Sequence, residues 1–332
     1  MQKTTVNKII VTAKLALGVV LLLSLLLWGD NFKELWKLLK SIKAQDVLML
    51  CIVSLLLNWI SCLKWSLFLK ERGFHVSQLR LLGLYLVGKF FSNFVPTTVG
   101  GDLTRTFLLG RQINSQSQSF ASVFLERITG LAALIVMAVF FLLLNPRLMQ
   151  DPKISISILC FAVGFVLSIA LMLNQRMVDW MAARSGKVPF LVVVLEKIKK
   201  VQRDILYFKG KYQLLTKALV YSFIFHMVSC LNVYVACLAV GVFPSFLDIA
   251  VVTPVILLLN ILPVSPNNIG WWEWTFSFLL VEAGAGRTEG LAVGLILRAI
   301  TLLFSVAGGV IFLFEKNRKG ESAAGQACRV DS

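Results

Sequence analysis

The sequence predicts an all-α polytopic membrane protein. Of its 332 residues, 58% are hydrophobic and only 15% are charged, whereas a typical soluble domain has about 25% charged residues. The mean hydropathy is +0.81, and the apolar residues form long blocks instead of alternating with polar ones. The net charge of +16 lies mostly between those blocks, where anionic lipid headgroups explain it better than nucleic acid does. These observations exclude an ordinary soluble domain.

About six segments are predicted to cross the bilayer, taking ~20 apolar residues as one crossing. They cover residues 9–28, 46–67, 120–144, 154–173, 214–240 and 291–314. The first resembles a signal peptide, but no small-residue cleavage site follows it. Trp28-Gly29-Asp30 is instead typical of a helix end at the membrane interface, so we expect an uncleaved first span.

Two further apolar segments, about 79–111 and 246–284, are each interrupted near the middle. The interrupting residues are Pro96, Gly100 and Gly101 in the first and Pro263, Pro266 and Gly270 in the second. Broken backbone at membrane depth is tolerated only where it is buried in protein or lines a wet cavity. We therefore predict two re-entrant hairpins, hinged at the prolines, whose breaks point inward to a site. The alternative is that each half crosses fully, which would give up to ten spans.

The distribution of Lys and Arg predicts the orientation. Residues 176–211 are rich in both and are expected to be cytoplasmic, whereas 241–250 contain neither and are expected to be external. This places both termini in the cytoplasm. The Lys-rich segment 30–45 then falls outside, and its apolar residues at helical spacing favour an interfacial amphipathic helix. No linker divides the chain, so we expect one domain over 1–314 and a disordered cytoplasmic tail over 315–332.

The two broken segments repeat the same pattern. Pro96 and Gly100 recur as Pro266 and Gly270 at an offset of 170 residues. An acid closely follows each glycine, and an arginine comes later in each half; these are Asp102 and Arg127, and Glu273 and Arg298. Together the matches indicate duplicated halves. Three predicted spans separate the hairpins, and an odd number reverses direction, so the repeat is predicted to be inverted.

Charged side chains within or beside the apolar segments are the candidate site. Each would cost at least ~2.5 to 3.5 kcal/mol if it faced lipid at a helix centre, so they must face inward. They are Lys89, Asp102, Arg105, Glu126, Arg127, Glu273 and Arg298. Four cations against three acids leave one positive charge unmatched, which favours an anionic phosphate. The alternative is a set of buried ion pairs that hold the bundle together.

Uncharged residues at the breaks complete the candidate site. Gly100, Gly101 and Gly270 leave backbone N–H groups accessible to an anion, and Asn93 either caps freed backbone groups or contacts the ligand. No metal or cofactor is predicted, because the two histidines, His75 and His226, lie near no cluster of Cys or carboxylates. No catalytic motif appears in the sequence.

These motifs resemble a known family. The residues concerned are Gly88–Pro96, Gly100-Gly101-Asp102, Arg105, Leu125-Glu126-Arg127, Pro266, Gly270, Glu273 and Arg298. Together they resemble the lysylphosphatidylglycerol synthase transmembrane-region family, also called flippase-like. The resemblance covers residues 10–315 and implies a bacterial inner-membrane protein whose relatives move aminoacylated phospholipids or other polyisoprenoid- or glycerol-based lipids between leaflets. This sequence departs from the pattern at Asn267-Asn268, where relatives often have Gly-Gly, and at Trp272, where many have Arg.

We therefore expect translocation of an anionic or aminoacylated phospho- or glycolipid between leaflets through a polar midplane site. Arg105, Arg127 and Arg298 would contact the lipid phosphate, and the three acids would orient them or meet a cationic headgroup. We do not expect an enzyme, because only a short tail follows residue 314 where the synthase has its aminoacyltransferase domain. Membrane lipids are the expected partners, and nucleic acid is not. The alternatives are a transferase in lipid modification or in cell-envelope lipid or glycan synthesis, and a membrane subunit that partners a lipid-modifying enzyme.

Overall fold

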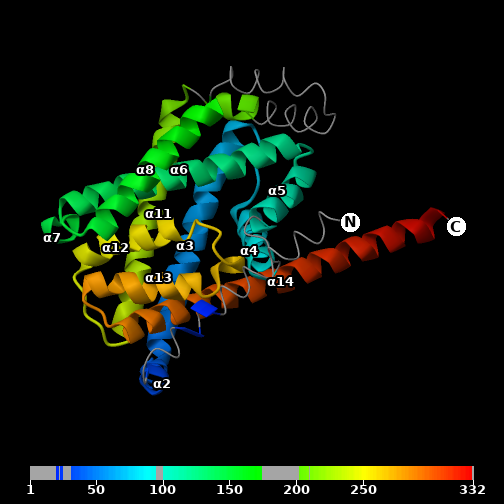
Figure 1. The fold of residues 1–332 in the computed structure, drawn as a ribbon. Helices are drawn as coiled ribbons and strands as arrows, with labels where there is room; N and C mark the ends of the chain where they lie inside the picture. Colours follow the sequence, from blue (N-terminus) through cyan, green and yellow to red (C-terminus); the bar gives the residue numbers. More distant parts are fainter. Residues whose placement is uncertain are drawn as a thin grey trace, which may run out of the picture.

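The structure, a computed structural model, describes residues 20, 21, 23, 24, 31–94, 100–173, 202–208 and 210–330. Those residues form helices and connecting loops, and no strand occurs among them, so the predicted all-α class is confirmed (Figure 1). The helices are α2 (Asn31–Ser41), α3 (Ala44–Glu71), α4 (Gln78–Phe94), α5 (Gly100–Gln112), α6 (Gln116–Leu143), α7 (Pro146–Met149), α8 (Pro152–Leu173), α11 (Tyr212–Ala239), α12 (Phe246–Leu259), η1 (Pro266–Asn268), α13 (Trp271–Leu279), η2 (Leu280–Ala283) and α14 (Arg287–Val330).

Five of the described helices are long and apolar enough to cross a membrane. They are α3, α6, α8, α11 and the part of α14 up to Phe314. Each coincides with a predicted span. The sixth predicted span, 9–28, lies almost entirely outside the described residues, as do Pro96 and most of the segment 176–211. α8 is the least buried of the five, and its Ile156, Leu159 and Val166 are exposed, as expected of a lipid-facing helix.

Short helices replace full spans in both interrupted segments. α4, α5, α12 and α13 contain 17, 13, 14 and 9 residues. At 1.5 Å per residue they reach about 26, 20, 21 and 14 Å, which is less than the ~30 Å of a hydrocarbon core. Their lengths therefore favour re-entrant hairpins over the alternative in which each half crosses fully.

The break between α12 and α13 follows from its residues. Asn267 and Asn268 both have left-handed backbone, with φ of 52° and 53°, and Gly270 has φ of 80°. Asn and Gly are the residues that adopt this region at low cost. Glu273 then caps α13, because its Oε2 accepts a hydrogen bond from the Gly270 N–H at 2.8 Å. The helix therefore stops and restarts within the segment, as the Pro and Gly pattern predicts.

Two helices of equal length pack side by side in opposite directions. The C-terminal end of α3 meets the N-terminal end of α11, where Glu71 pairs with Lys211 and Arg72 pairs with Asp204 just before α11 (Figure 1). We call α3–α6 the first unit and α11–α14 the second unit. Each consists of a long helix, a broken hairpin and a second long helix. The opposed first helices agree with an inverted repeat.

Each hairpin packs against the last helix of the other unit. α4 of the first hairpin lies along α14, and α12 of the second hairpin lies along α6. The α4–α14 contact is close, because a Cβ atom at Gly308 would lie 2.0 Å from the Leu86 backbone oxygen. The two units are therefore interlocked, and their hairpins face one interior.

α2 and α14 are the first and last of the described helices named above. In α2, Leu35 is buried in the apolar core while Lys33, Lys37 and Lys40 are exposed, which is the amphipathic pattern predicted for residues 30–45. α14 continues as a helix to Val330, where the sequence suggested a disordered tail from residue 315. That stretch is rich in Glu, Lys, Arg, Ala and Gln, which are good helix formers.

Candidate functional site

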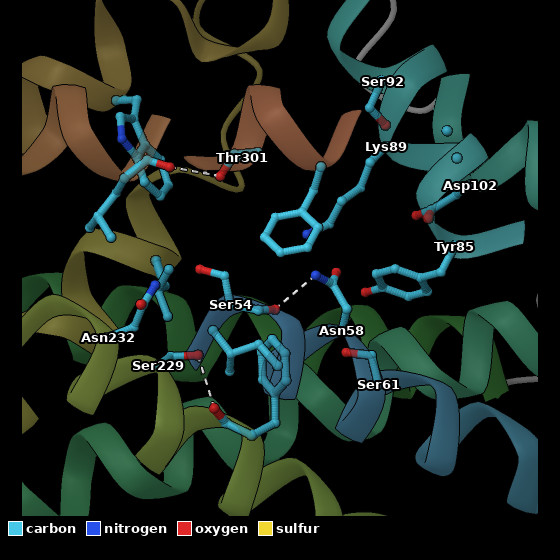
Figure 2. Close-up of a pocket in the computed structure, with 18 of the residues that line it drawn as sticks. Ser54, Asn58, Ser61, Tyr85, Lys89, Ser92, Asp102, Ser229, Asn232 and Thr301 are labelled. Atoms are coloured by element: carbon cyan, nitrogen blue, oxygen red, sulfur yellow. Dashed lines mark hydrogen bonds between the residues drawn. The ribbon is translucent and has the colours of Figure 1, made fainter. Parts of the chain in front are cut away.

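Two adjoining cavities lie between the units, which we together call the chamber. Their volumes are about 290 and 620 Å³; the larger lies within the range of small-molecule and cofactor sites, about 300 to 1,000 Å³, and the smaller lies at its lower limit. Both are lined by Tyr85, Asp102, Arg127 and Trp272, so side chains from the two hairpins border the same space. Figure 2 shows the lining of one of the cavities, with polar side chains directed into it from several helices.

Arg105 is the buried centre of the first unit's charge network. Its side chain is 2% exposed; Nε donates to Asp102 Oδ1 at 3.0 Å and Nη2 donates to Glu126 Oε2 at 2.6 Å. The guanidinium also lies 5.1 and 4.9 Å from the ring centroids of Trp65 and Tyr85. Asp102 and Arg105 are three residues apart on α5, so they share a face, as the spacing predicts.

Arg127 is bound to the same acid but is open to the chamber. Its Nε donates to Asp102 Oδ2 at 3.0 Å and its Nη2 donates to Asp102 Oδ1 at 2.9 Å. The Arg127 side chain is 58% exposed, whereas the neighbouring Glu126 side chain is 4% exposed. Adjacent residues on a helix point apart, as predicted for this pair. Asp102 therefore holds Arg127 through Nε and Nη2, while the remaining edge of the guanidinium faces the chamber.

The second unit repeats this acid–arginine pair. Arg298 Nε donates to Glu273 Oε1, and Nη2 donates to Glu273 Oε2 at 3.3 Å. Both the Asp102–Arg127 and the Glu273–Arg298 pairs join residues that are 25 apart in sequence. Arg298 also donates to the Asn268 backbone oxygen at 2.9 Å, so it satisfies a carbonyl freed by the break. The repeat seen in sequence is thus also a repeat of one ion pair.

Lys89 has no acidic partner among the residues that the structure describes. Its closest charge-stabilising neighbours are the rings of Tyr85 and Phe304, whose centroids lie 5.9 and 6.0 Å from Nζ. Figure 2 shows Lys89 extending from α4 into the cavity toward Asn58 of α3. An intramembrane cation without a counter-ion marks a place where an anion would be stabilised.

Lys64 was not among the residues predicted from sequence. It is 5% exposed and its Nζ lies 3.8 Å from Glu126 Oε1. The available signal was a lysine inside a predicted span, which rarely occurs without a function or a partner. With Lys64 included, the charged side chains around the chamber in the part of the chain that the structure describes are five cations and three carboxylates, a net charge of +2. The excess of one positive charge expected from sequence is therefore larger in the structure.

The remaining predicted residues divide between lining and packing. Asn93 lines the larger cavity and donates to Ser305 Oγ across the unit boundary. Gly101 lines the smaller cavity, but its main constraint is packing, since a Cβ there would lie 2.2 Å from the Gly88 oxygen. Gly100 and Gly270 line neither cavity and begin helices instead. Pro266 begins η1, and Pro263 lies between α12 and η1.

Uncharged polar residues form a wall that sequence reasoning missed. Ser54, Asn58 and Ser61 line the smaller cavity from α3, and Ser229 and Asn232 line it from α11. Their spacing of three and four residues puts each set on one helix face. That polar stripe within an apolar span was the available signal. His226 lines the larger cavity and its Nε2 lies 2.9 Å from the Gly130 oxygen, in line with a core histidine.

The fold and the chamber define a class: helical membrane proteins in which two opposed, broken hairpins enclose a charged cavity. The chain belongs to the lysylphosphatidylglycerol synthase TM region family, whose model matches residues 11–309. It is 24% identical over 327 residues to a UPF0104 membrane protein of Pyrococcus horikoshii, an alignment that covers 91% of this chain and 96% of the relative. It is 25% identical over 274 residues to a UPF0104 membrane protein of Methanothermobacter thermautotrophicus, which covers 75% and 77%.

Proposed function

We propose that this protein moves the headgroup of a phosphate-bearing lipid, anionic or aminoacylated, between the leaflets of a bacterial cytoplasmic membrane. The observation that carries the proposal is the chamber itself, a cavity between the two broken hairpins whose described charged side chains have a net charge of +2. A lipid phosphate is the anion that every bilayer supplies. Membership of a family named for a lipid synthase supports a lipid ligand.

Lys89 and Arg127 are the groups best placed to hold the phosphate. Asp102 occupies Nε and Nη2 of Arg127, which leaves Nη1 directed away from the acid. Lys89 contributes a second cation from α4 without an acidic partner in the described chain. Arg105 and Arg298 are held by Glu126 and Glu273, and we assign them to shaping the chamber. This assignment refines the expectation that three arginines contact the phosphate.

The proposal treats the protein as a carrier and not as an enzyme. A carboxylate acts as a general base only when it is free to take a proton. Asp102, Glu126 and Glu273 are each bound by arginine, with donors at 3.3 Å or less. The acyl chains would remain in the bilayer while the headgroup passes the chamber. Both termini would lie in the cytoplasm, as the Lys and Arg distribution predicts.

Headgroup movement in proteoliposomes tests the proposal. We would reconstitute the purified protein with fluorescent anionic, zwitterionic and lysyl lipids and measure the fraction that crosses with time. The Lys89→Gln/Arg127→Gln variant is expected to lose the acceleration. Lys153→Gln is the matched control, because Lys153 is 73% exposed and pairs with Glu282 outside the chamber. If no lipid crosses faster than in protein-free vesicles, the proposal is wrong.

A further inference from the structure

The uncharged polar wall of the chamber, formed by Ser54, Asn58, Ser61, Ser229 and Asn232, indicates which headgroup groups besides the phosphate the chamber can bind. Asn58 Nδ2 donates to the Ser54 backbone oxygen at 2.8 Å, and Ser229 Oγ donates to the Phe225 backbone oxygen at 2.9 Å (Figure 2). Thr301 Oγ1 on the opposite side donates to the Leu297 oxygen at 2.9 Å. Each of these side chains therefore has a donor satisfied by its own helix, while its oxygen remains able to accept from a ligand; Asn58 also keeps a second N–H.

One acceptor on this wall is unsatisfied. Asn232 Oδ1 is buried and has no hydrogen-bond partner. Asn232 lies three residues after Ser229 on α11 and lines the same cavity. An amide oxygen buried without a partner costs free energy, so its retention is explained when a ligand donates to it. The wall therefore fits a headgroup that brings hydrogen-bond donors.

Two kinds of headgroup bring donors: those with hydroxyl groups and those with ammonium groups. The charge of the chamber separates them. Lys89 on the facing side has no acidic partner in the described chain, and all three carboxylates are bound by arginine. An ammonium group placed here would meet a net positive charge, and no acid among the described residues is free to pair with it. Hydroxyl groups donate the same hydrogen bonds without that repulsion.

We infer that the chamber selects an anionic lipid whose headgroup is an uncharged polyol, such as glycerol or a sugar, and disfavours an aminoacylated or other ammonium headgroup. The phosphate would lie at Lys89 and Arg127, and the hydroxyl groups would donate to Asn58, Ser229 and Asn232. The inference rests on the proposed function for its biological meaning. It makes a claim about binding that is testable without transport.

Native mass spectrometry of the delipidated protein with defined lipids tests the binding claim. Phosphatidylglycerol and phosphatidylinositol supply the polyol headgroup, phosphatidic acid supplies phosphate alone, and phosphatidylethanolamine and lysylphosphatidylglycerol supply ammonium groups. We expect the polyol lipids to bind most tightly. Loss of one such hydrogen bond is worth about two- to tenfold in affinity. Asn232→Leu and Ser229→Ala are therefore expected to lower the affinity for polyol lipids by that factor and to leave phosphatidic acid unchanged.

Two further variants test the inference. Ser168→Ala is the control for Ser229→Ala, because Ser168 makes the same bond to its own helix, to the Gly164 oxygen at 2.7 Å, on α8 outside the chamber. Lys89→Glu is expected to bring the ammonium lipids up to or above the polyol lipids. Equal binding of polyol and ammonium lipids by the wild type, or tighter binding of lysylphosphatidylglycerol, would overturn the inference. If polyol lipids bind selectively and none is translocated, the inference stands and the proposed function fails.

Discussion

Lys89 and Arg105 are cations of the same chamber with opposite energetic roles. Arg105 is fully enclosed and bound by two acids, whereas Lys89 has only aromatic neighbours in the described chain. A partly buried charge without a counter-ion destabilises the protein that contains it. Lys89 is thus retained at a cost in stability, which is the pattern of a functional residue.

Replacing Lys89 by methionine is expected to leave the melting temperature unchanged or to raise it while headgroup movement falls. The reason is that the variant removes an unpaired charge and keeps the volume of the side chain. Differential scanning fluorimetry and the proteoliposome assay measure the two effects on one preparation. A large fall in melting temperature would show that Lys89 is structural.

Replacing Arg105 by methionine is expected to destabilise the protein by about 3 to 5 kcal/mol, since it leaves the buried Glu126 and the partly buried Asp102 without their shared partner. Steric trapping or urea unfolding in detergent measures the difference in free energy of unfolding. A change smaller than about 1 kcal/mol would mean that Lys64 and Arg127 already satisfy the two acids.

Sequence reasoning found most charged residues of the site but not how they are paired. The cost of a charge in lipid is large, so Asp102, Arg127 and Arg298 could be recognised individually. Which acid binds which arginine depends on the crossing of α5 with α6 and of α13 with α14, and no local pattern encodes that. Neutral residues such as Asn232 were missed because a polar amide in a span costs less and stands out less.

At the scale of elements, the first hairpin depends on a glycine contact. A Cβ atom on Gly101 would lie 2.1 Å from Ser92 Oγ and 2.2 Å from the Gly88 oxygen. The second of these is backbone and cannot move aside alone, so α4 and α5 would have to separate. Gly101, which the sequence suggested for anion contact, is thus what allows α4 and α5 to pack closely.

Gly101→Ala is therefore expected to destabilise the protein by about 1 to 3 kcal/mol through overpacking. Gly164→Ala is the matched control on α8, because a Cβ there meets nothing within 4 Å. That control is expected to be neutral or to stabilise by up to about 1 kcal/mol, since alanine favours the helix. Thermal unfolding of both variants under one condition checks the contrast. Equal effects would mean that the α4–α5 contact is looser than described.

The second hairpin shows which local features were readable in sequence. Pro263, Pro266 and Gly270 predict a break in the helix, and the break lies at these residues, between α12 and α13. Asn267 and Asn268 have left-handed φ values, which explains why asparagine is suitable at both positions. The capture of their carbonyls by Arg298, 30 and 31 residues away, was not readable, because it depends on the packing of α13 on α14.

At the scale of the molecule, the junction between the two units ends in a polar cluster. The pKa of Lys211 is raised above its usual value, mainly by its side-chain hydrogen bond to Glu71 and secondly by one to Tyr207. A raised pKa means that the folded state holds the proton more tightly. The stabilisation is therefore complete below the unfolded lysine pKa of about 10.4 and is lost as the pH rises through the higher folded value.

The melting temperature of the wild type is thus expected to fall more steeply than that of Lys211→Gln between pH 9 and pH 12. Fluorimetry in matched buffers measures both slopes. Parallel curves would show that the Lys211–Glu71 pair contributes no stability at the α3–α11 junction. The glutamine variant retains a hydrogen-bonding side chain, so the comparison isolates the proton.

The packing of each hairpin on the other unit's last helix constrains how the molecule changes shape. Because α4 is held by α14 and α12 by α6, neither unit can move without carrying part of the other. Under the proposed function, an inverted pair would reach the opposite-facing state when each unit adopts the conformation that the other has now. The described conformation can therefore serve as a template for the opposite-facing one. Building α3–α6 on the backbone of α11–α14, and α11–α14 on the backbone of α3–α6, gives coordinates for that second conformation. Distances measured by spin labels on the two hairpins would then be compared with two specified geometries.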